Sequence, residues 1–116
     1  MKKTLAIFGS TGSIGKTTLS IVQKDNNFKI KLLTTNKNAK LILNQAIKFN
    51  VKDVIIENKY IYKKYYSKFK KQNIRLHLSF HNIKKIFKKK ISYCVNAISG
   101  IEGLEPTLKI IPYTSN

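Results

Sequence analysis

The sequence predicts an α/β fold, in which an open, doubly wound parallel sheet of about five strands carries the helices. Short apolar runs alternate with segments of helical periodicity along the chain, and such alternation forms right-handed βαβ units. The first apolar run leads directly into a glycine-rich loop, which is typical of a parallel strand followed by a helix. With 116 residues, 42% of them hydrophobic, the chain is long enough for one domain with its own core.

Five apolar runs have the length of strands, and the first of them stops at Gly9, as a buried parallel strand does. We predict strands at residues 5–8, 28–33, 54–56, 75–78 and 92–96. The remaining segments have apolar residues at helical spacing, and helices are predicted at residues 14–22, 39–49, 61–69, 83–87 and 104–111. Asn38 is a suitable N-cap for the second helix, and the turn cluster at 25–27 ends the first.

Helical spacing identifies the first two helices. Ile14, Leu19 and Ile21 recur at this spacing in the first, and Ile42, Ala46 and Ile47 do so in the second. In the third helix, positions 61, 65 and 69 together with 62 and 66 form one apolar stripe, with lysines on the exposed side. A similar mixture of aromatic and basic residues binds single-stranded nucleic acid, so a basic nucleic-acid-binding module stays an alternative.

The chain is strongly basic, with 23 Lys and Arg against 5 Asp and Glu and a net charge of +18. Arg75 is its only arginine, whereas surfaces that bind nucleic acid usually include several, so solvated lysine faces are the favoured interpretation. The positive field still attracts ligands that carry phosphate. No apolar run approaches the ~20 residues of a membrane helix. A single cysteine allows no internal disulfide, and we expect a cytoplasmic protein.

Residues 9–15, with the sequence GSTGSIG, have the spacing of a dinucleotide-binding loop. Gly9 permits a tight turn, Gly12 lets the backbone approach a pyrophosphate, and Gly15 lets the helix pack close to the strand. The free N–H groups and the dipole at the start of that helix favour an anion. The loop therefore predicts a dinucleotide site on a Rossmann-like sheet.

The end of the second predicted strand indicates which dinucleotide binds. An NAD site has an acidic residue there, which accepts a hydrogen bond from the ribose 2′-hydroxyl. This chain has Asn36, Lys37 and Asn38 instead. A cation with amide donors suits a 2′-phosphate, which favours NADP(H).

A P-loop is an alternative interpretation of the same residues. Gly15, Lys16 and Thr17 match the end of the pattern GxxxxGK[ST], but the first glycine should then be residue 10, which is Ser10. Glu57, after the strand at 54–56, could imitate the acid that holds Mg²⁺ in nucleotide hydrolases.

Three segments in order resemble the family of 1-deoxy-D-xylulose 5-phosphate reductoisomerases. The loop GSTGSIG at residues 9–15 is similar to the loop that follows the first strand of that family. Residues 36–38 resemble its GKN motif, with Asn36 in place of the glycine, and residues 96–108 resemble its AIxGxxGLxPTL segment. Asn tolerates positive φ better than most residues.

The resemblance implies that Thr11, Gly12, Ser13 and Ile14 contact the cofactor phosphates and ribose, and that Lys37 and Asn38 hold the 2′-phosphate with Asn36 beside them. Together with the glycines of the loop, the predicted cofactor-binding residues are Gly9, Thr11, Gly12, Ser13, Ile14, Gly15, Asn36, Lys37 and Asn38. The cofactor it implies is NADPH.

The resemblance also implies the reaction of the family. With NADPH and Mg²⁺ or Mn²⁺, a homodimeric enzyme of the non-mevalonate isoprenoid pathway converts 1-deoxy-D-xylulose 5-phosphate to 2-C-methyl-D-erythritol 4-phosphate. The motifs expected after residue 108, including an acidic metal-binding triad, are not found in this sequence. We therefore expect residues 1–116 to be the NADPH-binding domain of an N-terminal fragment, without catalytic or metal-binding residues and inactive alone. His77, His81 and Cys94 are expected to be structural.

Overall fold

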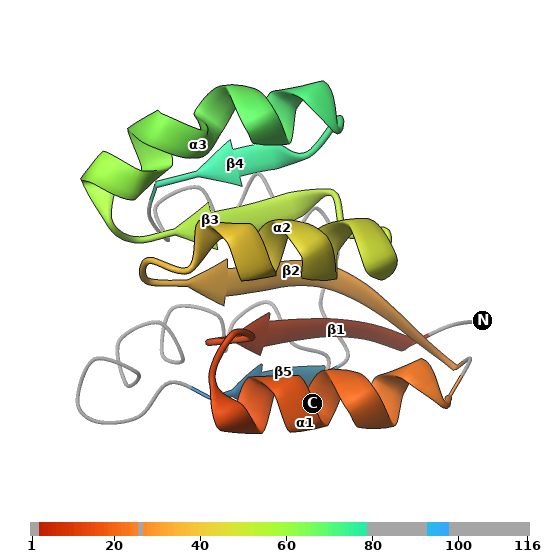
Figure 1. Cartoon of the computed structure of the whole chain (residues 1–116). Coiled ribbons are helices and arrows are strands. Elements are labelled where there is room, and N and C mark those ends of the chain that lie inside the picture. Colours follow the sequence, from red (N-terminus) through yellow and green to blue (C-terminus); the bar gives the residue numbers. More distant parts are fainter. Residues whose placement is uncertain (1–2, 26, 79–92, 98–116) are drawn as a thin grey trace.

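A computed structural model describes residues 3–25, 27–78 and 93–97. Five parallel strands form one sheet in the order β4-β3-β2-β1-β5 (Figure 1). The strands are β1 (Lys3–Phe8), β2 (Phe28–Thr35), β3 (Asp53–Ile56), β4 (Arg75–His77) and β5 (Tyr93–Asn96). The predicted open α/β sheet of about five parallel strands is thereby confirmed.

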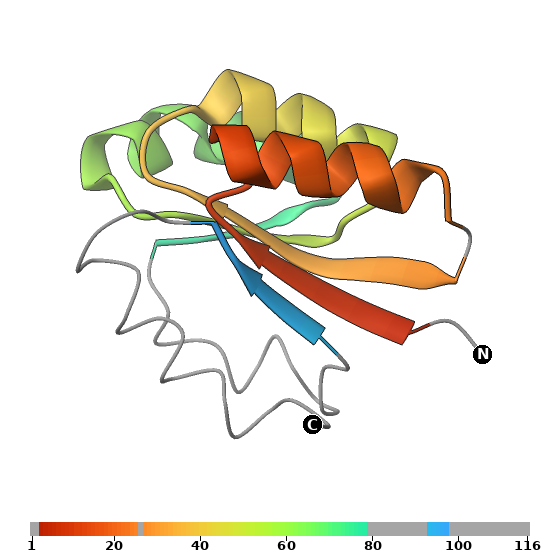
Figure 2. The same ribbon diagram turned by 90° about the horizontal axis from the view of Figure 1, so that it is seen from below.

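Three helices cover one face of this sheet: α1 (Ser13–Gln23), α2 (Ala39–Lys48) and α3 (Lys59–Lys71) (Figures 1 and 2). The strands run outward from β1 to β4, whereas β5 lies on the opposite side of β1. The strand order therefore reverses at β1, which is the position where ligands of open α/β sheets bind. The helices predicted at 83–87 and 104–111 lie outside the described residues, and no described helix has the length and apolar character needed to cross a membrane.

Polar residues cap the ends of α2 and α3. The side chain of Asn38 accepts a hydrogen bond from the backbone N–H of Leu41 at 3.3 Å, and Asn58 accepts one from Ile61 at 3.0 Å. The predicted cap at Asn38 is confirmed. Just after each helix, Asn50 and Asn73 have positive φ values of 55° and 60°, the left-handed conformation that often ends a helix.

The core lies between the sheet and the three helices, and each helix contributes at least one buried apolar residue: Leu19, Ile42 and Phe69. Helix α1 packs through Gly15, Leu19 and Val22, which recur at intervals of four and three residues. Three isoleucines whose spacing helped to predict these helices, Ile14, Ile21 and Ile47, lie off the packing stripes and are 62%, 65% and 50% exposed.

The aromatic stripe of α3 packs largely as predicted. Phe69 is fully buried, and Ile61, Tyr62 and Tyr65 pack against the core from partly buried positions. Tyr66 is instead 43% exposed and makes an edge-to-face contact with Tyr62, with ring centroids 5.5 Å apart. Most of these rings therefore stabilise the fold and are not presented together to a ligand.

Cys94 lies in β5 and is partly buried, as expected of a packed thiol. Burial raises the pKa of this thiol to about 11, so it carries its proton at neutral pH. The reactive form of cysteine is the thiolate, and the residue is therefore poorly suited to nucleophilic chemistry.

Candidate nucleotide-binding cleft

A cleft of about 420 Å³ lies at the carboxyl ends of β1, β2, β3 and β5. It is lined by residues that follow these strands or end them: Gly9, Thr11, Gly12, Thr34, Thr35, Asn36, Lys37, Asn38, Glu57 and Ala97. The cleft lies where the strand order reverses, so its position is the one expected for a ligand site.

The first bank of the cleft is the glycine loop, which is tied to the end of β2. Gly9 has a φ of 77°, a conformation that glycine adopts without steric cost. The backbone N–H groups of Gly9 and Ser10 both donate to the carbonyl of Thr34, at 3.1 and 3.0 Å. The N–H of Gly9 also contacts the hydroxyl oxygen of Thr34 at 3.0 Å. These bonds hold the loop in a defined turn over the end of the sheet.

A buried pair of hydrogen bonds joins the same loop to α2. The hydroxyl of Ser10, which is fully buried, donates to Oε1 of Gln45 at 2.8 Å. The Nε2 group of Gln45 donates back to the carbonyl of Ser10 at 2.9 Å. Both polar groups of the Gln45 amide are therefore used, as burial requires. Sequence reasoning missed this contact, since no local pattern pairs residues 10 and 45.

Gly12 and Gly15 shape the start of α1. Gly12 is the N-cap of this helix and offers no side chain to cap it. Its carbonyl accepts the first helical bond from Lys16 at 2.9 Å, so the N–H groups of the three residues between them precede the helical ladder. A Cβ atom at Gly15 would lie 2.5 Å from the Cα of Ser10, so only glycine allows α1 to start this close to the loop.

The second bank is the segment after β2. The hydroxyls of Thr11 and Thr35 lie 2.7 Å apart and connect the two banks. The carbonyl of Asn36 accepts a bond from the N–H of Asn58 at 3.0 Å. Among the described residues, positive φ values occur at Gly9, Asn50 and Asn73 and not at Asn36, so the backbone there suits a side chain as well as glycine. Lys37 is exposed at the rim of the cleft.

The structure brings six of the nine predicted cofactor-binding residues to this cleft: Gly9, Thr11, Gly12, Asn36, Lys37 and Asn38. Ser13, Ile14 and Gly15 form the first turn of α1 and are not among the lining residues. Thr34, Thr35, Glu57 and Ala97 line the cleft without having been assigned to it. The sequence could have identified these four residues, since all of them lie at or just after the carboxyl end of a predicted strand.

The P-loop interpretation is not supported by this geometry. Lys16 lines a separate groove between α1 and α2, together with Leu41 and Lys48, and not the cleft. The hydroxyl of Thr17 donates to the carbonyl of Ser13 at 3.0 Å, within the helix. A P-loop would direct both side chains at a bound phosphate and its metal.

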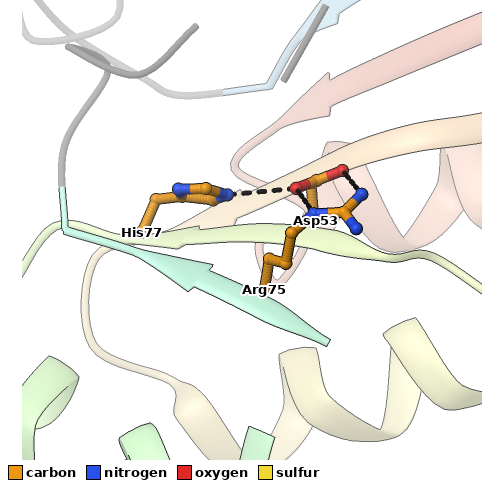
Figure 3. A network of polar contacts seen from close by, with 3 residues as sticks. All are labelled: Asp53, Arg75 and His77. Carbon is orange, nitrogen blue, oxygen red and sulfur yellow. Dashed lines mark hydrogen bonds and ion pairs between the residues drawn. The ribbon is translucent and has the colours of Figure 1, made fainter. Parts of the chain in front are cut away.

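A second polar cluster lies at the β3–β4 edge of the sheet (Figure 3). Asp53, whose side chain is 6% exposed, accepts two hydrogen bonds from Arg75, both at 2.8 Å. Nε2 of His77 lies 3.0 Å from the same carboxylate and donates to it, since a carboxylate can only accept. The sequence pattern had offered His77 no carboxylate partner; the register that sets Asp53 beside Arg75 and Ile55 beside His77 supplies one.

Burial of the Asp53 carboxyl acts to raise its pKa, but the hydrogen bonds from His77 and Arg75 and the charge of Arg75 outweigh this effect and hold the pKa below its usual 3.8. Because the folded-state pKa is lowered, the resulting stabilisation is complete above pH 3.8 and is lost as the pH falls through the folded-state value. We expect Asp53→Asn to lower the free energy of unfolding at neutral pH by about 1–3 kcal/mol. The free energy of unfolding of this variant should also fall less steeply than that of the wild type as the pH is lowered.

Urea denaturation of both proteins from neutral to acid pH measures this difference. Asp25→Asn, in an exposed turn, removes one charge without touching the cluster and is the matched control. Parallel acid profiles for wild type and Asp53→Asn would contradict the assignment of this carboxylate.

No group of three or more His, Cys, Asp or Glu side chains able to hold a metal ion is present in the part of the chain that the structure describes. His81 lies outside that part. The cleft, with a helix start that has no side-chain cap on one side and a lysine on the other, fits a nucleotide.

The parallel sheet, the glycine loop and the cleft at the point of strand reversal define a Rossmann-like nucleotide-binding domain. The family model for 1-deoxy-D-xylulose 5-phosphate reductoisomerase matches residues 5–115 of the chain. The chain belongs to this family.

Curated reductoisomerases similar to this chain support its assignment to the family. The 1-deoxy-D-xylulose 5-phosphate reductoisomerase of Pelagibacter ubique is 46% identical over 117 residues, which cover 98% of this chain and 30% of the relative. That of Wolbachia pipientis from Culex pipiens is 32% identical over 96% of this chain and 28% of its own length. The chain thus spans about 30% of the length of the curated relatives it matches.

Solved structures agree in fold. The reductoisomerase of Zymomonas mobilis in complex with NADPH superposes with a TM-score of 0.84 at 24% identity, over 96% of this chain and 30% of that one. A reductoisomerase in complex with NADPH, fosmidomycin and magnesium gives a TM-score of 0.81 at 27% identity, over 92% of this chain and 27% of the other.

Proposed function

We propose that this chain binds NADPH in the cleft described above, as the dinucleotide-binding part of a 1-deoxy-D-xylulose 5-phosphate reductoisomerase. The observation that carries the proposal is the convergence of the glycine loop and the Lys37 segment on one cleft. The family membership and the NADPH bound to related solved structures support it.

The glycine loop and the segment after β2 have different roles in this proposal. The N–H groups at the start of α1 face the pyrophosphate, and the helix dipole favours its charge. Lys37 neutralises the 2′-phosphate. Asn38 uses its side-chain oxygen to cap α2, so its amide N–H₂ group is the part left to donate to that phosphate. Once bound, NADPH supplies a hydride to the substrate.

The family reaction converts 1-deoxy-D-xylulose 5-phosphate to 2-C-methyl-D-erythritol 4-phosphate with NADPH and a divalent metal, and we propose that this chain contributes cofactor binding to it. Residues 1–116 then act as one NADPH-binding domain. Neither the metal nor the sugar phosphate is assigned a ligand among the described residues.

The first test is a titration of the purified chain with NADPH, with NADH and Mg·ATP in parallel. We expect NADPH to bind more tightly than NADH, and ATP to bind weakly. Lys37→Ala should weaken NADPH about 10-fold or more and leave NADH nearly unchanged, since a charge-assisted contact to the phosphate contributes about 1.5–3 kcal/mol. Lys40→Ala, an exposed lysine that does not line the cleft, is the control. Equal losses for both cofactors in Lys37→Ala would refute the 2′-phosphate assignment.

The chain alone should not catalyse the family reaction. We expect no substrate-dependent oxidation of NADPH, followed by the loss of its absorbance, when the 116-residue chain is mixed with 1-deoxy-D-xylulose 5-phosphate and Mn²⁺. The reason is that the sequence has five acidic residues in all, and those described form no metal site. Measurable product from the pure chain would overturn this expectation.

A further inference from the structure

Glu57 lines the same cleft from its β3 side. It directly follows β3, and its backbone N–H donates to the carbonyl of Thr35 at 3.0 Å. The next residue, Asn58, donates to Asn36 at 3.0 Å and caps α3. The backbone at Glu57 is therefore held against the segment that carries Lys37, and its side chain is exposed towards solvent and the cleft.

Glu57 is the one acidic residue among those that line the cleft, and Lys37 is the one basic residue. A carboxylate repels phosphate and can only accept hydrogen bonds, so the part of a ligand that contacts it has to be a donor. This argument rests on the proposed function, which places the pyrophosphate at α1 and the 2′-phosphate at the segment after β2. In that placement the base of the adenosine would extend towards Glu57, because β3 lies next to β2 in the sheet.

We propose that the carboxylate of Glu57 accepts a hydrogen bond from the exocyclic amino group of adenine and thereby selects this base. A purine with an oxo group at the same carbon presents an acceptor to the carboxylate. The carboxylate then loses its hydrogen bond from the amino group, and its oxygen lies against the oxo group, which is also an acceptor. The cleft then recognises two features of one nucleoside, since Lys37 contacts its 2′-phosphate and Glu57 contacts its amino group.

The test compares NADPH with its hypoxanthine analogue, in which an oxo group replaces the adenine amino group and the neighbouring ring nitrogen carries a proton. We expect the wild-type chain to bind NADPH about 10-fold more tightly than the analogue. In Glu57→Gln the two should bind within about 2-fold of each other, because an amide can accept from the amino group and can donate to the oxo group. Asp25→Asn removes one carboxylate far from the cleft and should keep the wild-type ratio.

The outcomes separate this inference from the proposed function. A ratio that is the same in wild type and Glu57→Gln, or a wild type that does not distinguish the two cofactors, overturns the inference while NADPH binding and its preference over NADH still stand. An equal loss for both cofactors in Glu57→Gln also overturns it, since that result indicates a ribose hydroxyl as the donor. No NADPH binding by a chain that circular dichroism shows to be folded overturns both.

Discussion

Replacement of Gly15 by alanine should destabilise the protein by about 3 kcal/mol or more. The added Cβ would lie 2.5 Å from the Cα and 2.7 Å from the carbonyl carbon of Ser10, and backbone atoms cannot rotate away as a flexible side chain can. Relief requires α1 to move from the loop, which also disturbs the buried bonds between Ser10 and Gln45. Urea denaturation followed by circular dichroism measures the loss.

Gly12→Ala is the matched control, because it adds the same methyl group three residues earlier. Its Cβ would lie 3.6 Å from the carbonyl oxygen of Gly9, an ordinary contact, and the φ of −80° suits any residue. We expect a change within about 1 kcal/mol. Similar stabilities for Gly15→Ala and the wild type would show that the close approach of α1 to the loop is not required.

Replacement of Gly12 by valine should weaken NADPH binding about 100-fold, which corresponds to about 2.7 kcal/mol. The glycine at this position lets the backbone approach the pyrophosphate, and a branched side chain would take the space of the phosphate oxygens. The extended backbone of Gly12 is compatible with valine, so the fold should be retained. The measurement is a fluorescence titration with NADPH, accompanied by circular dichroism.

Two comparisons sharpen this second experiment. Gly12→Ala should give an intermediate affinity, since its methyl group occupies less of the cleft. Ile21→Ala removes an exposed side chain of α1 that does not line the cleft and should bind NADPH nearly as wild type does. Unchanged NADPH affinity in a folded Gly12→Val protein would show that the pyrophosphate does not bind at the start of α1.

The two glycine experiments concern the part of the site that could be predicted from the sequence. The spacing of Gly9, Gly12 and Gly15 is a local pattern, and each glycine has a conformational or steric requirement that a short loop imposes by itself. Alternating apolar runs likewise specified the five strands, because the periodicity of burial is written into neighbouring residues. Three consecutive residues after β2, none of them acidic, were enough to predict a 2′-phosphate on the ligand.

The sequence did not decide which face of α1 packs on the sheet. Ile14 and Ile21 lie one position before Gly15 and Val22, so both pairs of residues have helical spacing. The close approach at Gly15 orients α1 on the sheet, and this rotation turns both isoleucines outward. Periodicity identifies a helix, but two adjacent apolar rows on one helix leave its rotation undetermined.

Taken by itself, the sequence determined the α/β class, the glycine loop, the Asn38 cap and the family to which the chain belongs. Only the tertiary structure decided that Gln45 holds Ser10, that Asp53 joins Arg75 and His77, and that Glu57 shares a cleft with Lys37. The physical reason is that these contacts join residues on different strands and helices. Strand order and register set which side chains meet across a sheet, and no window of consecutive residues contains that information.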